Sequence, residues 1–192
     1  MTIRKNESLY LGPQPSYDNI KLKEGEEIRD VTPEEVIDII QEQNIVALYQ
    51  GRSEAGPRAL GNRSLLFDPT VKDGKDQVNT IKKREWFRPF AGTIMAEHVH
   101  DWFDLRGMDD TPFMMYAVNA ASEEKAEQIP SIMHVDKTCR IQTVTEEQNA
   151  NYYNLIKVFY ERTGVPILFN TSFNLGGEPL VETVEDALWT VE

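Results

Sequence analysis

Residues Asn151–Asn174, NYYNLIKVFYERTGVPILFNTSFN, place a helix, a strand and a polar stretch in direct succession. Apolar side chains recur at the spacing of one buried helix face, at Tyr152, Leu155, Ile156 and Phe159. Gly164 suits the position just past the end of such a helix. Val165–Phe169 then predicts a buried strand that runs into NTSFN. A helix followed directly by a strand is typical of an α/β sheet.

The rest of the chain repeats this alternation. Thr32-Pro33-Glu34-Glu35 predicts a helix start with a capping box, and Asn44 closes that helix. A second helix is expected at about 72–83, and a last one opens at Thr183. Strands are expected at 45–49, 64–67, 90–95, 113–118 and 140–144. The sequence therefore predicts an α/β protein.

Composition narrows the class of protein. The chain has 192 residues, 40% of them hydrophobic and 27% charged, as in an ordinary globular domain. It contains no apolar run long enough to span a membrane and no secretory signal, and its single cysteine, Cys139, fits a reducing cytoplasm. A net charge of −12 argues against non-specific binding of nucleic acid. We expect a polar lead-in segment or linker at 1–30 and a domain at 31–192.

A stretch rich in arginine and glycine, GRSEAGPRALGNRS (Gly51–Ser64), follows the expected strand at 45–49. Guanidinium groups fit phosphate or carboxylate through two hydrogen bonds, and glycine lets backbone N–H groups approach a ligand. Open α/β sheets bind ligands just beyond their strands. The stretch therefore indicates an anion-binding loop, or alternatively a surface turn whose arginines pair with the many carboxylates.

Three further polar stretches lie next to expected strands: IKKREWFRPF (81–90), HVDKTCRIQT (134–143) and NTSFNLGGEP (170–179). With the arginine stretch they hold nearly half of the 20 lysines and arginines. A polyanionic substrate such as a nucleotide explains this concentration.

Structural roles compete with this interpretation. Arg63 and Arg84 could pair with Glu54 or Glu85, and His134 could be an ordinary hydrogen-bonded residue. Three aromatic residues are expected in the core, namely Trp86, Phe87 and Phe90. The spacing of the histidines and carboxylates predicts no metal site on this chain.

Four long motifs together resemble the C-terminal part of the nodulation-protein and antibiotic-biosynthesis O-carbamoyltransferases. They are GRSEAGPRALGNRSLLFDP, IKKREWFRPFA, HVDKTCRIQTV and GVPILFNTSFNLGGEPLVETVEDAL, and the resemblance spans roughly residues 44–190. It implies a YrdC-like twisted open sheet flanked by helices. It also implies a transferase that makes carbamoyl-adenylate from ATP and carbamoyl phosphate, with Mg²⁺ on the pyrophosphate oxygens.

The resemblance assigns the site residues. Lys82-Lys83-Arg84 matches the K-x-R motif of YrdC-like proteins, and Ser172-Phe173-Asn174 matches their S-x-N motif. ATP and carbamoyl phosphate would be bound by Arg58, Lys82, Arg84, Arg88, His134, Arg140, Ser172 and Asn174. Among these, Arg58, Lys82 and Arg88 would act in catalysis.

The sequence departs from the family because the N-terminal, Kae1-like half is missing. That half would carry a metal and transfer the carbamoyl group to a hydroxyl acceptor, so we expect it as another part of a longer chain or as a separate subunit. The sequence also stops within its last expected helix, which predicts a truncated C-terminus. Two alternatives remain open: a free-standing threonylcarbamoyl-adenylate synthase of the YrdC type, and a non-catalytic nucleotide-binding module of a split complex.

Overall fold

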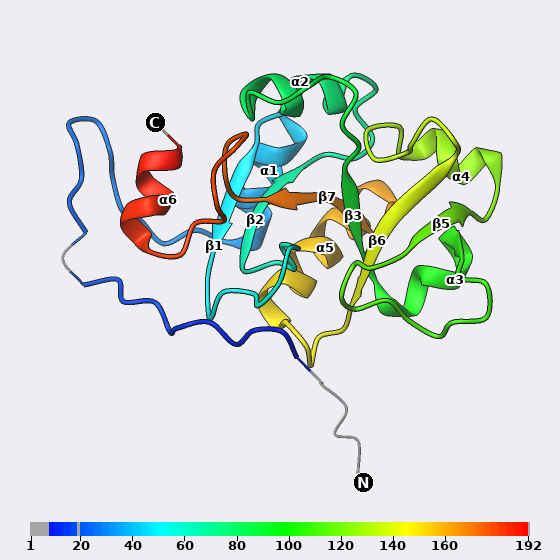
Figure 1. Ribbon diagram of the computed structural model, residues 1–192, viewed down its shortest axis with the longest axis horizontal. Helices are drawn as coiled ribbons and strands as arrows, with labels where there is room; N and C mark the ends of the chain where they lie inside the picture. Colours follow the sequence, from blue (N-terminus) through cyan, green and yellow to red (C-terminus); the bar gives the residue numbers. More distant parts are fainter. Residues whose placement is uncertain (1–7, 19, 192) are drawn as a thin grey trace, which may run out of the picture.

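The computed structural model describes residues 8–18 and 20–191 and contains one open, mixed sheet with helices around it (Figure 1). The seven strands follow the order β1-β2-β7-β3-β6-β5-β4. Only β3 and β6 run parallel among these neighbours. The strands are β1 (Val46–Tyr49), β2 (Arg63–Phe67), β3 (Ala91–Met95), β4 (Phe103–Asp104), β5 (Ala117–Ala120), β6 (Thr138–Val144) and β7 (Ile167–Ser172).

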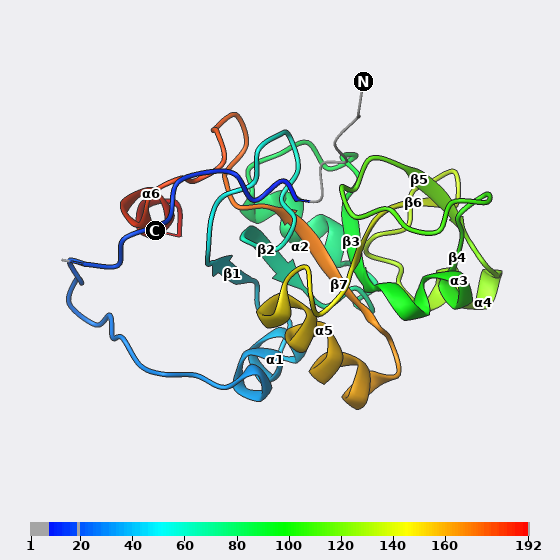
Figure 2. The same cartoon turned by 90° about the horizontal axis from the view of Figure 1, so that it is seen from below.

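Two helices form the main layer on the sheet, α1 (Pro33–Gln41) and α5 (Ala150–Thr163). They pack against each other, and α5 also contacts β3 and β7 (Figure 2). The expected capping box of α1 is present, and α5 ends at Gly164 with φ of 75°. The other helices are α2 (Gly74–Ile81), the short 3-10 turn η1 (Ala96–His98), α3 (Val99–Trp102), α4 (Glu123–Gln128) and α6 (Val184–Thr190).

The core lies between the sheet and these helices. β2 and β3 are buried along their whole length, which fits their places inside the sheet, where each has a strand on both sides. Cys139 is fully buried on β6, as expected for a strand packing residue. A smaller cluster joins α6 to the β1–β2 side of the sheet through Leu65, Phe173 and Ala187. Among residues 8–18 and 20–191, no helix is long and apolar enough to cross a membrane.

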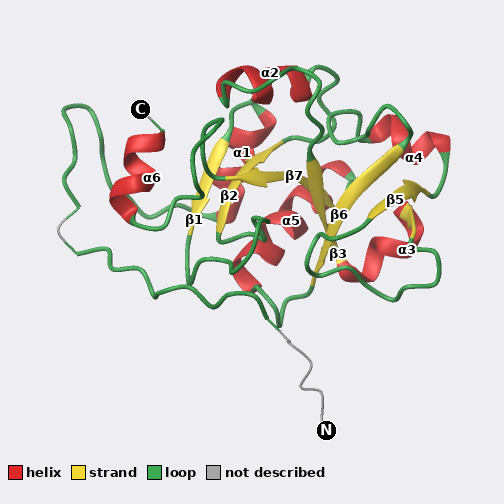
Figure 3. Ribbon diagram, in the orientation of Figure 1, coloured by secondary structure: helices red, strands yellow, loops and turns green. Residues whose placement is uncertain are grey.

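The structure corrects one predicted strand. Residues 113–116 do not belong to a strand, and β5 begins only at Ala117. Met114 has φ of 54°, a left-handed conformation that interrupts an extended run, and it lies between β4 and β5 in the sequence. Figure 3 shows a long loop that leads into β5. The strand predicted at 165–169 is instead β7, which begins at Ile167 and continues through Ser172. Asn170 and Ser172 are therefore strand residues.

The expected burial of three aromatic residues is only partly confirmed. Phe90 is 4% exposed, but Trp86 is 73% exposed and Phe87 is 62% exposed. Both exposed rings lie in a turn before β3 and contact each other edge to face. The prediction of core positions was wrong for these two residues because they lie in a turn that leaves their side chains exposed.

Candidate anion-binding site

Residues 51–62, here named the arginine loop, connect β1 to β2 and are fixed by a buried carboxylate. Glu54 Oε1 accepts hydrogen bonds from the backbone N–H groups of Leu60, Asn62 and Arg63 at 2.7, 2.8 and 3.3 Å. Glu54 is 7% exposed. One carboxylate oxygen thus gathers three amides and closes the loop, which explains how a glycine-rich segment keeps a defined shape.

The segment at 9–12 crosses the arginine loop from outside. Tyr10 Oη donates a hydrogen bond to the carbonyl of Leu60 at 2.7 Å. The Gly12 N–H group donates to the Ser53 carbonyl, and Arg52 donates to the carbonyl of Gly12. This part of the polar lead-in therefore supports the loop.

A row of three register partners forms the nearby sheet surface. Ala91 on β3 pairs with Arg140 on β6 and with Asn170 on β7. Register partners point to the same face of a sheet, and strands lie about 4.8 Å apart, so Arg140 and Asn170 are about 10 Å apart with a small alanine between them. This arrangement leaves a hollow above Ala91.

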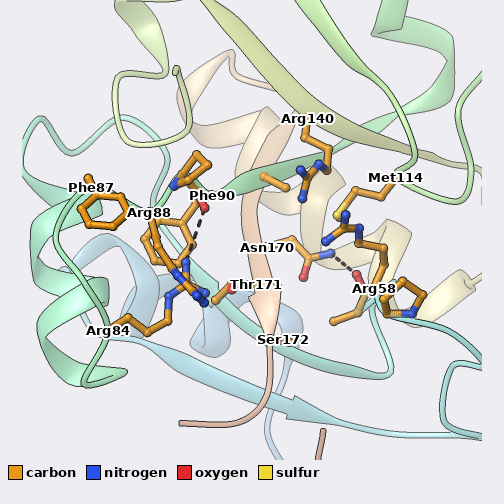
Figure 4. A pocket seen from close by; sticks show the side chains of 14 residues that line it. Arg58, Arg84, Phe87, Arg88, Phe90, Met114, Arg140, Asn170, Thr171 and Ser172 are labelled. Carbon is orange, nitrogen blue, oxygen red and sulfur yellow. Dashed lines mark hydrogen bonds between the residues drawn. The ribbon is translucent and has the colours of Figure 1, made fainter. Parts of the chain in front are cut away.

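A cavity of about 420 Å³ occupies that hollow. Figure 4 shows Arg84 and Arg88 on one side, Arg58 and Arg140 on the other, and β7 between the two pairs. No aspartate or glutamate lines the cavity within the described part of the chain. The lining residues are Pro57, Arg58, Ala59, Arg84, Phe87, Arg88, Pro89, Phe90, Ala91, Met114, Arg140, Asn170, Thr171 and Ser172.

The positive charges in this cavity are incompletely compensated. Burial lowers the pKa of Arg84, and the charge of Arg88 lowers it further. Burial and the charge of Arg58 lower the pKa of Arg140 in the same way. In the described part of the chain, the buried Nε atoms of Arg58 and Arg84 have no hydrogen-bond partner. Among the same residues, Arg88 is the one arginine of the four that forms an ion pair, with Glu85 at 3.0 Å. An anion would relieve this repulsion.

The sequence-predicted residues are distributed unevenly about the cavity. Five of them line it: Arg58, Arg84, Arg88, Arg140 and Ser172. Lys82 is fully buried and is not among the lining residues. Its Nζ donates to the carbonyls of Ser172 and Asn174 and, at 3.0 Å, to Asn174 Oδ1. The K-x-R and S-x-N motifs are thus joined by hydrogen bonds through Lys82.

Lys82 is subject to opposing influences. Burial lowers its pKa, with a further contribution from the charge of Arg84. The three oxygen acceptors around Nζ favour the charged ammonium group instead. The geometry makes Lys82 a residue that holds the Ser172–Asn174 segment in place.

His134 lies outside the arginine cavity. Its ring nitrogens lie 3.0 Å from the Phe90 carbonyl and 3.1 Å from Thr138 Oγ1, so both take part in hydrogen bonds. It lines two neighbouring depressions together with Met133 and Asp136. The ordinary hydrogen-bonding role that the sequence left open for His134 agrees with these contacts.

The suggested pairing of Arg63 with Glu54 takes another form. Arg63 is fully buried, and its Nη1 donates to the carbonyls of Gln50, Gly51 and Asn62. Its guanidinium group also lies over the Tyr49 ring, 3.7 Å from the centroid. Arg63 is therefore structural, through carbonyls and a ring instead of a carboxylate.

Several cavity residues were not singled out from the sequence. Asn170 lies within the motif NTSFN, but a polar strand residue gives no signal of its orientation. Met114 reaches the cavity because of the turn that replaces a predicted strand. Within residues 8–18 and 20–191, no three histidine, cysteine, aspartate or glutamate residues are close enough together to hold a metal ion.

Comparisons with known proteins agree with this architecture. The chain is 46% identical over 148 residues to nodulation protein NolO of Bradyrhizobium diazoefficiens, covering 76% of this chain and 27% of that protein. It is 37% identical over 142 residues to 3'-hydroxymethylcephem-O-carbamoyltransferase of Streptomyces clavuligerus, covering 74% of this chain and 26% of that protein. The chain thus spans about a quarter of the length of these relatives.

The fold is also found in a solved structure. Full-length HypF in its phosphate- and nucleotide-bound form superposes with a TM-score of 0.58 at 20% sequence identity, covering 87% of this chain and 20% of HypF. The predicted α/β class, a YrdC-like open sheet flanked by helices, is confirmed. A protein-family model described as carbamoyltransferase C-terminus matches residues 37–192. The chain belongs to this carbamoyltransferase C-terminal family.

Proposed function

We propose that this chain makes carbamoyl-adenylate from ATP and carbamoyl phosphate, for transfer to a hydroxyl acceptor elsewhere in a larger enzyme. The observation that carries the proposal is the cavity with four guanidinium groups and no lining carboxylate in the described residues. Two anionic substrates repel each other, so their reaction requires concentrated positive charge.

The chemistry needs positioning and charge neutralisation but no protein nucleophile. Carbamoyl phosphate loses its phosphate to water and leaves carbamate. A carbamate oxygen then attacks the α-phosphorus of ATP, the bond from this phosphorus to the bridging oxygen breaks, and pyrophosphate leaves. Arginine suits this step because its planar group binds two oxygens of a phosphate or carboxylate at once.

The two pairs of arginines, on opposite sides of the cavity, could each bind one of the two reactants. Arg58 and Arg140 come from the arginine loop and β6, whereas Arg84 and Arg88 come from the segment before β3. Groups on separate elements can hold two reactants in line and lower the entropic cost of their encounter. Lys82 contributes indirectly by holding Ser172 and Asn174.

Mg²⁺ would enter this cavity with the nucleotide. The described lining residues include no carboxylate that could hold the ion, so the triphosphate oxygens would be its ligands. Bound there, Mg²⁺ would neutralise charge on the departing pyrophosphate. The carbamoyl acceptor and the metal of a Kae1-like half are proposed to lie outside this chain, which spans about a quarter of its relatives.

ATP–pyrophosphate exchange tests this proposal. We expect exchange that depends on carbamoyl phosphate and that falls sharply in Arg140→Ala. Lys157→Ala is a suitable control, because Lys157 is an exposed cation on α5 that does not line the cavity. Absence of carbamoyl phosphate-dependent exchange in the wild-type chain would contradict the proposal, and ATP binding without exchange would favour a non-catalytic nucleotide-binding module.

A further inference from the structure

Asn170 has an amide group whose orientation is fixed. Its Nδ2 lies 3.1 Å from the Ala59 carbonyl, 2.9 Å from Thr93 Oγ1 and 3.3 Å from Gln142 Oε1. A backbone carbonyl can only accept a hydrogen bond, so the nitrogen of Asn170 must face Ala59. Asn170 cannot exchange its oxygen and nitrogen positions without losing this bond.

The neighbouring Gln142 is fixed by the same reasoning. Its Nε2 donates to the Leu60 carbonyl at 3.0 Å, so its oxygen faces Thr93, which donates to it at 2.9 Å. All three side chains of this network are at least 98% buried, since Thr93, Gln142 and Asn170 are 0%, 2% and 1% exposed. The network therefore holds Asn170 rigidly against the arginine loop.

The remaining atom of the amide, Asn170 Oδ1, is buried and has no hydrogen-bond partner among residues 8–18 and 20–191. In Figure 4 it points away from the Ala59 carbonyl, into the space between the two pairs of arginines. A buried acceptor without a partner is unfavourable, and native proteins rarely retain one without a reason. Here a fixed acceptor stands in a cavity whose charged groups are all donors.

We infer that Asn170 Oδ1 accepts a hydrogen bond from the amino group of the carbamoyl unit and thereby determines specificity for it. The inference rests on the proposed function and adds how the substrate is recognised. A ligand that fits this position must carry negative charge for the arginines and an N–H donor for Oδ1. Carbamate has both features, because its two charged oxygens and its amino nitrogen are bonded to the same carbon.

The amino group of adenine is the other N–H donor that ATP would bring. Adenine is neutral, however, and gains less from four surrounding guanidinium groups than the carbamate and phosphate oxygens do. The position of Asn170 between Arg58 and Arg140 on one side and Arg84 and Arg88 on the other favours the carbamoyl group (Figure 4).

Acetyl phosphate provides the matched probe, because a methyl group replaces the amino group at nearly the same size. ATP–pyrophosphate exchange is measured with carbamoyl phosphate and with acetyl phosphate, in the wild type and in Asn170→Leu. We expect the wild type to prefer carbamoyl phosphate in kcat/KM by on the order of 10²-fold, since the methyl group of acetyl phosphate would leave the buried acceptor unpaired. In Asn170→Leu most of this preference should disappear.

The ratio of the two substrates separates recognition from structure. A variant that merely disturbs the cavity lowers exchange with both substrates alike, and Gln142→Leu is expected to do this, because it loosens the network but keeps Asn170 Oδ1. Asn170→Ser is a second variant in case leucine prevents folding, and melting curves show which variants are folded.

Each contrary result has its own meaning. An unchanged preference in folded Asn170 variants, or no preference in the wild type, would overturn the inference while leaving the proposed function intact. If the variants instead lose discrimination between ATP and inosine triphosphate, Asn170 reads the adenine amino group and our assignment is wrong. A wild-type chain without carbamoyl phosphate-dependent exchange overturns both the inference and the proposed function.

Discussion

Arg58 and Arg63 belong to one short stretch of sequence, but the structure gives them different surroundings. Arg63 is fully buried, its Nη1 donates to three backbone carbonyls, and its guanidinium group lies over the Tyr49 ring. Arg58 instead lines the cavity. A guanidinium group enclosed by carbonyls and a ring supports the fold, whereas one that opens onto a cavity is available to a ligand. Access to the cavity therefore distinguishes the ligand-binding role of Arg58 from the structural role of Arg63.

Arg88 allows a test of this distinction at a single residue. Arg88→Ala should slow carbamoyl phosphate-dependent exchange by about 10²–10³-fold, the scale of a lost transition-state donor. Arg88→Lys should also be slow, because a point charge cannot replace a planar fork of donors. Glu85→Gln removes the carboxylate partner of Arg88 and keeps its charge. If Glu85→Gln slows exchange as much as Arg88→Ala does, Arg88 acts through this ion pair and not on the substrate.

Lys82 is expected to affect stability as well as rate. Lys82→Met keeps much of the side-chain volume but removes three hydrogen bonds and leaves the Asn174 carbonyl without its Lys82 donor, at a cost of about 1–3 kcal/mol in the free energy of unfolding. Denaturant unfolding of Lys82→Met and of Lys157→Met measures this difference, since Lys157 is exposed on α5. A Lys82→Met variant of wild-type stability that has lost exchange would assign Lys82 to the substrate instead.

The pairing register of the strands, more than their sequence, forms the hollow above Ala91. Arg140, Ala91 and Asn170 come from three strands that are distant in the chain, and sheet pairing places them in one row. The small side chain in the middle of the row creates the space that the guanidinium groups surround.

Ala91→Leu tests whether ATP binds in the hollow above Ala91. A leucine at this position would fill the hollow while all four arginines remain, so ATP binding should fall by at least about tenfold, because ligand atoms and the new methyl groups cannot occupy the same space. Calorimetric titration measures the affinity, and Ala91→Ser is the matched small substitution, expected to bind ATP nearly as the wild type does. Normal ATP affinity in Ala91→Leu would place the nucleotide elsewhere.

Sequence periodicity predicted the long elements well. α5 and its glycine end, the capping box of α1 and the strand β3 follow from local patterns. Polar stretches beside strands indicated an anion site, and the family resemblance singled out Arg58, Arg84, Arg88 and Arg140 within them, which line one cavity. Such patterns are local, so they can be read without knowledge of the pairing.

Other features could not be predicted because they depend on tertiary contacts. The positive φ of Met114 ends an apparent strand, and a turn exposes Trp86 despite its apolar ring. The sequence offered Glu54 as a partner for an arginine side chain, whereas its Oε1 accepts hydrogen bonds from three backbone N–H groups. The burial of Lys82 and the fixed amide of Asn170 likewise arise from residues far apart in the sequence.

For the whole molecule, the charge distribution is the main electrostatic feature. The chain carries a net charge of −12, yet four arginines surround one cavity. An anionic ligand is therefore repelled by the molecule at long range and attracted at the cavity. Local attraction between partly exposed charges is weakened by salt.

ATP affinity should accordingly fall as the salt concentration rises from about 0.05 M to about 0.5 M, because the Debye screening length shortens to a few ångströms over this range. Arg88→Ala should show a shallower dependence, because one exposed cation of the cavity is gone. Calorimetry at several salt concentrations measures both slopes. Affinity that does not change with salt would show that apolar contacts, and not the arginines, dominate binding.

The buried Cys139 has a practical consequence. It is the only cysteine in the chain, it lies on β6 between β3 and β5, and burial raises the pKa of its thiol. The thiolate is the reactive form, so an alkylating reagent should leave the folded protein untouched and label it only when β6 separates from its neighbours. The rate of labelling therefore reports how often the sheet opens, without an introduced cysteine or dye. Slower labelling in the presence of ATP would show how much ligand binding stabilises the centre of the molecule.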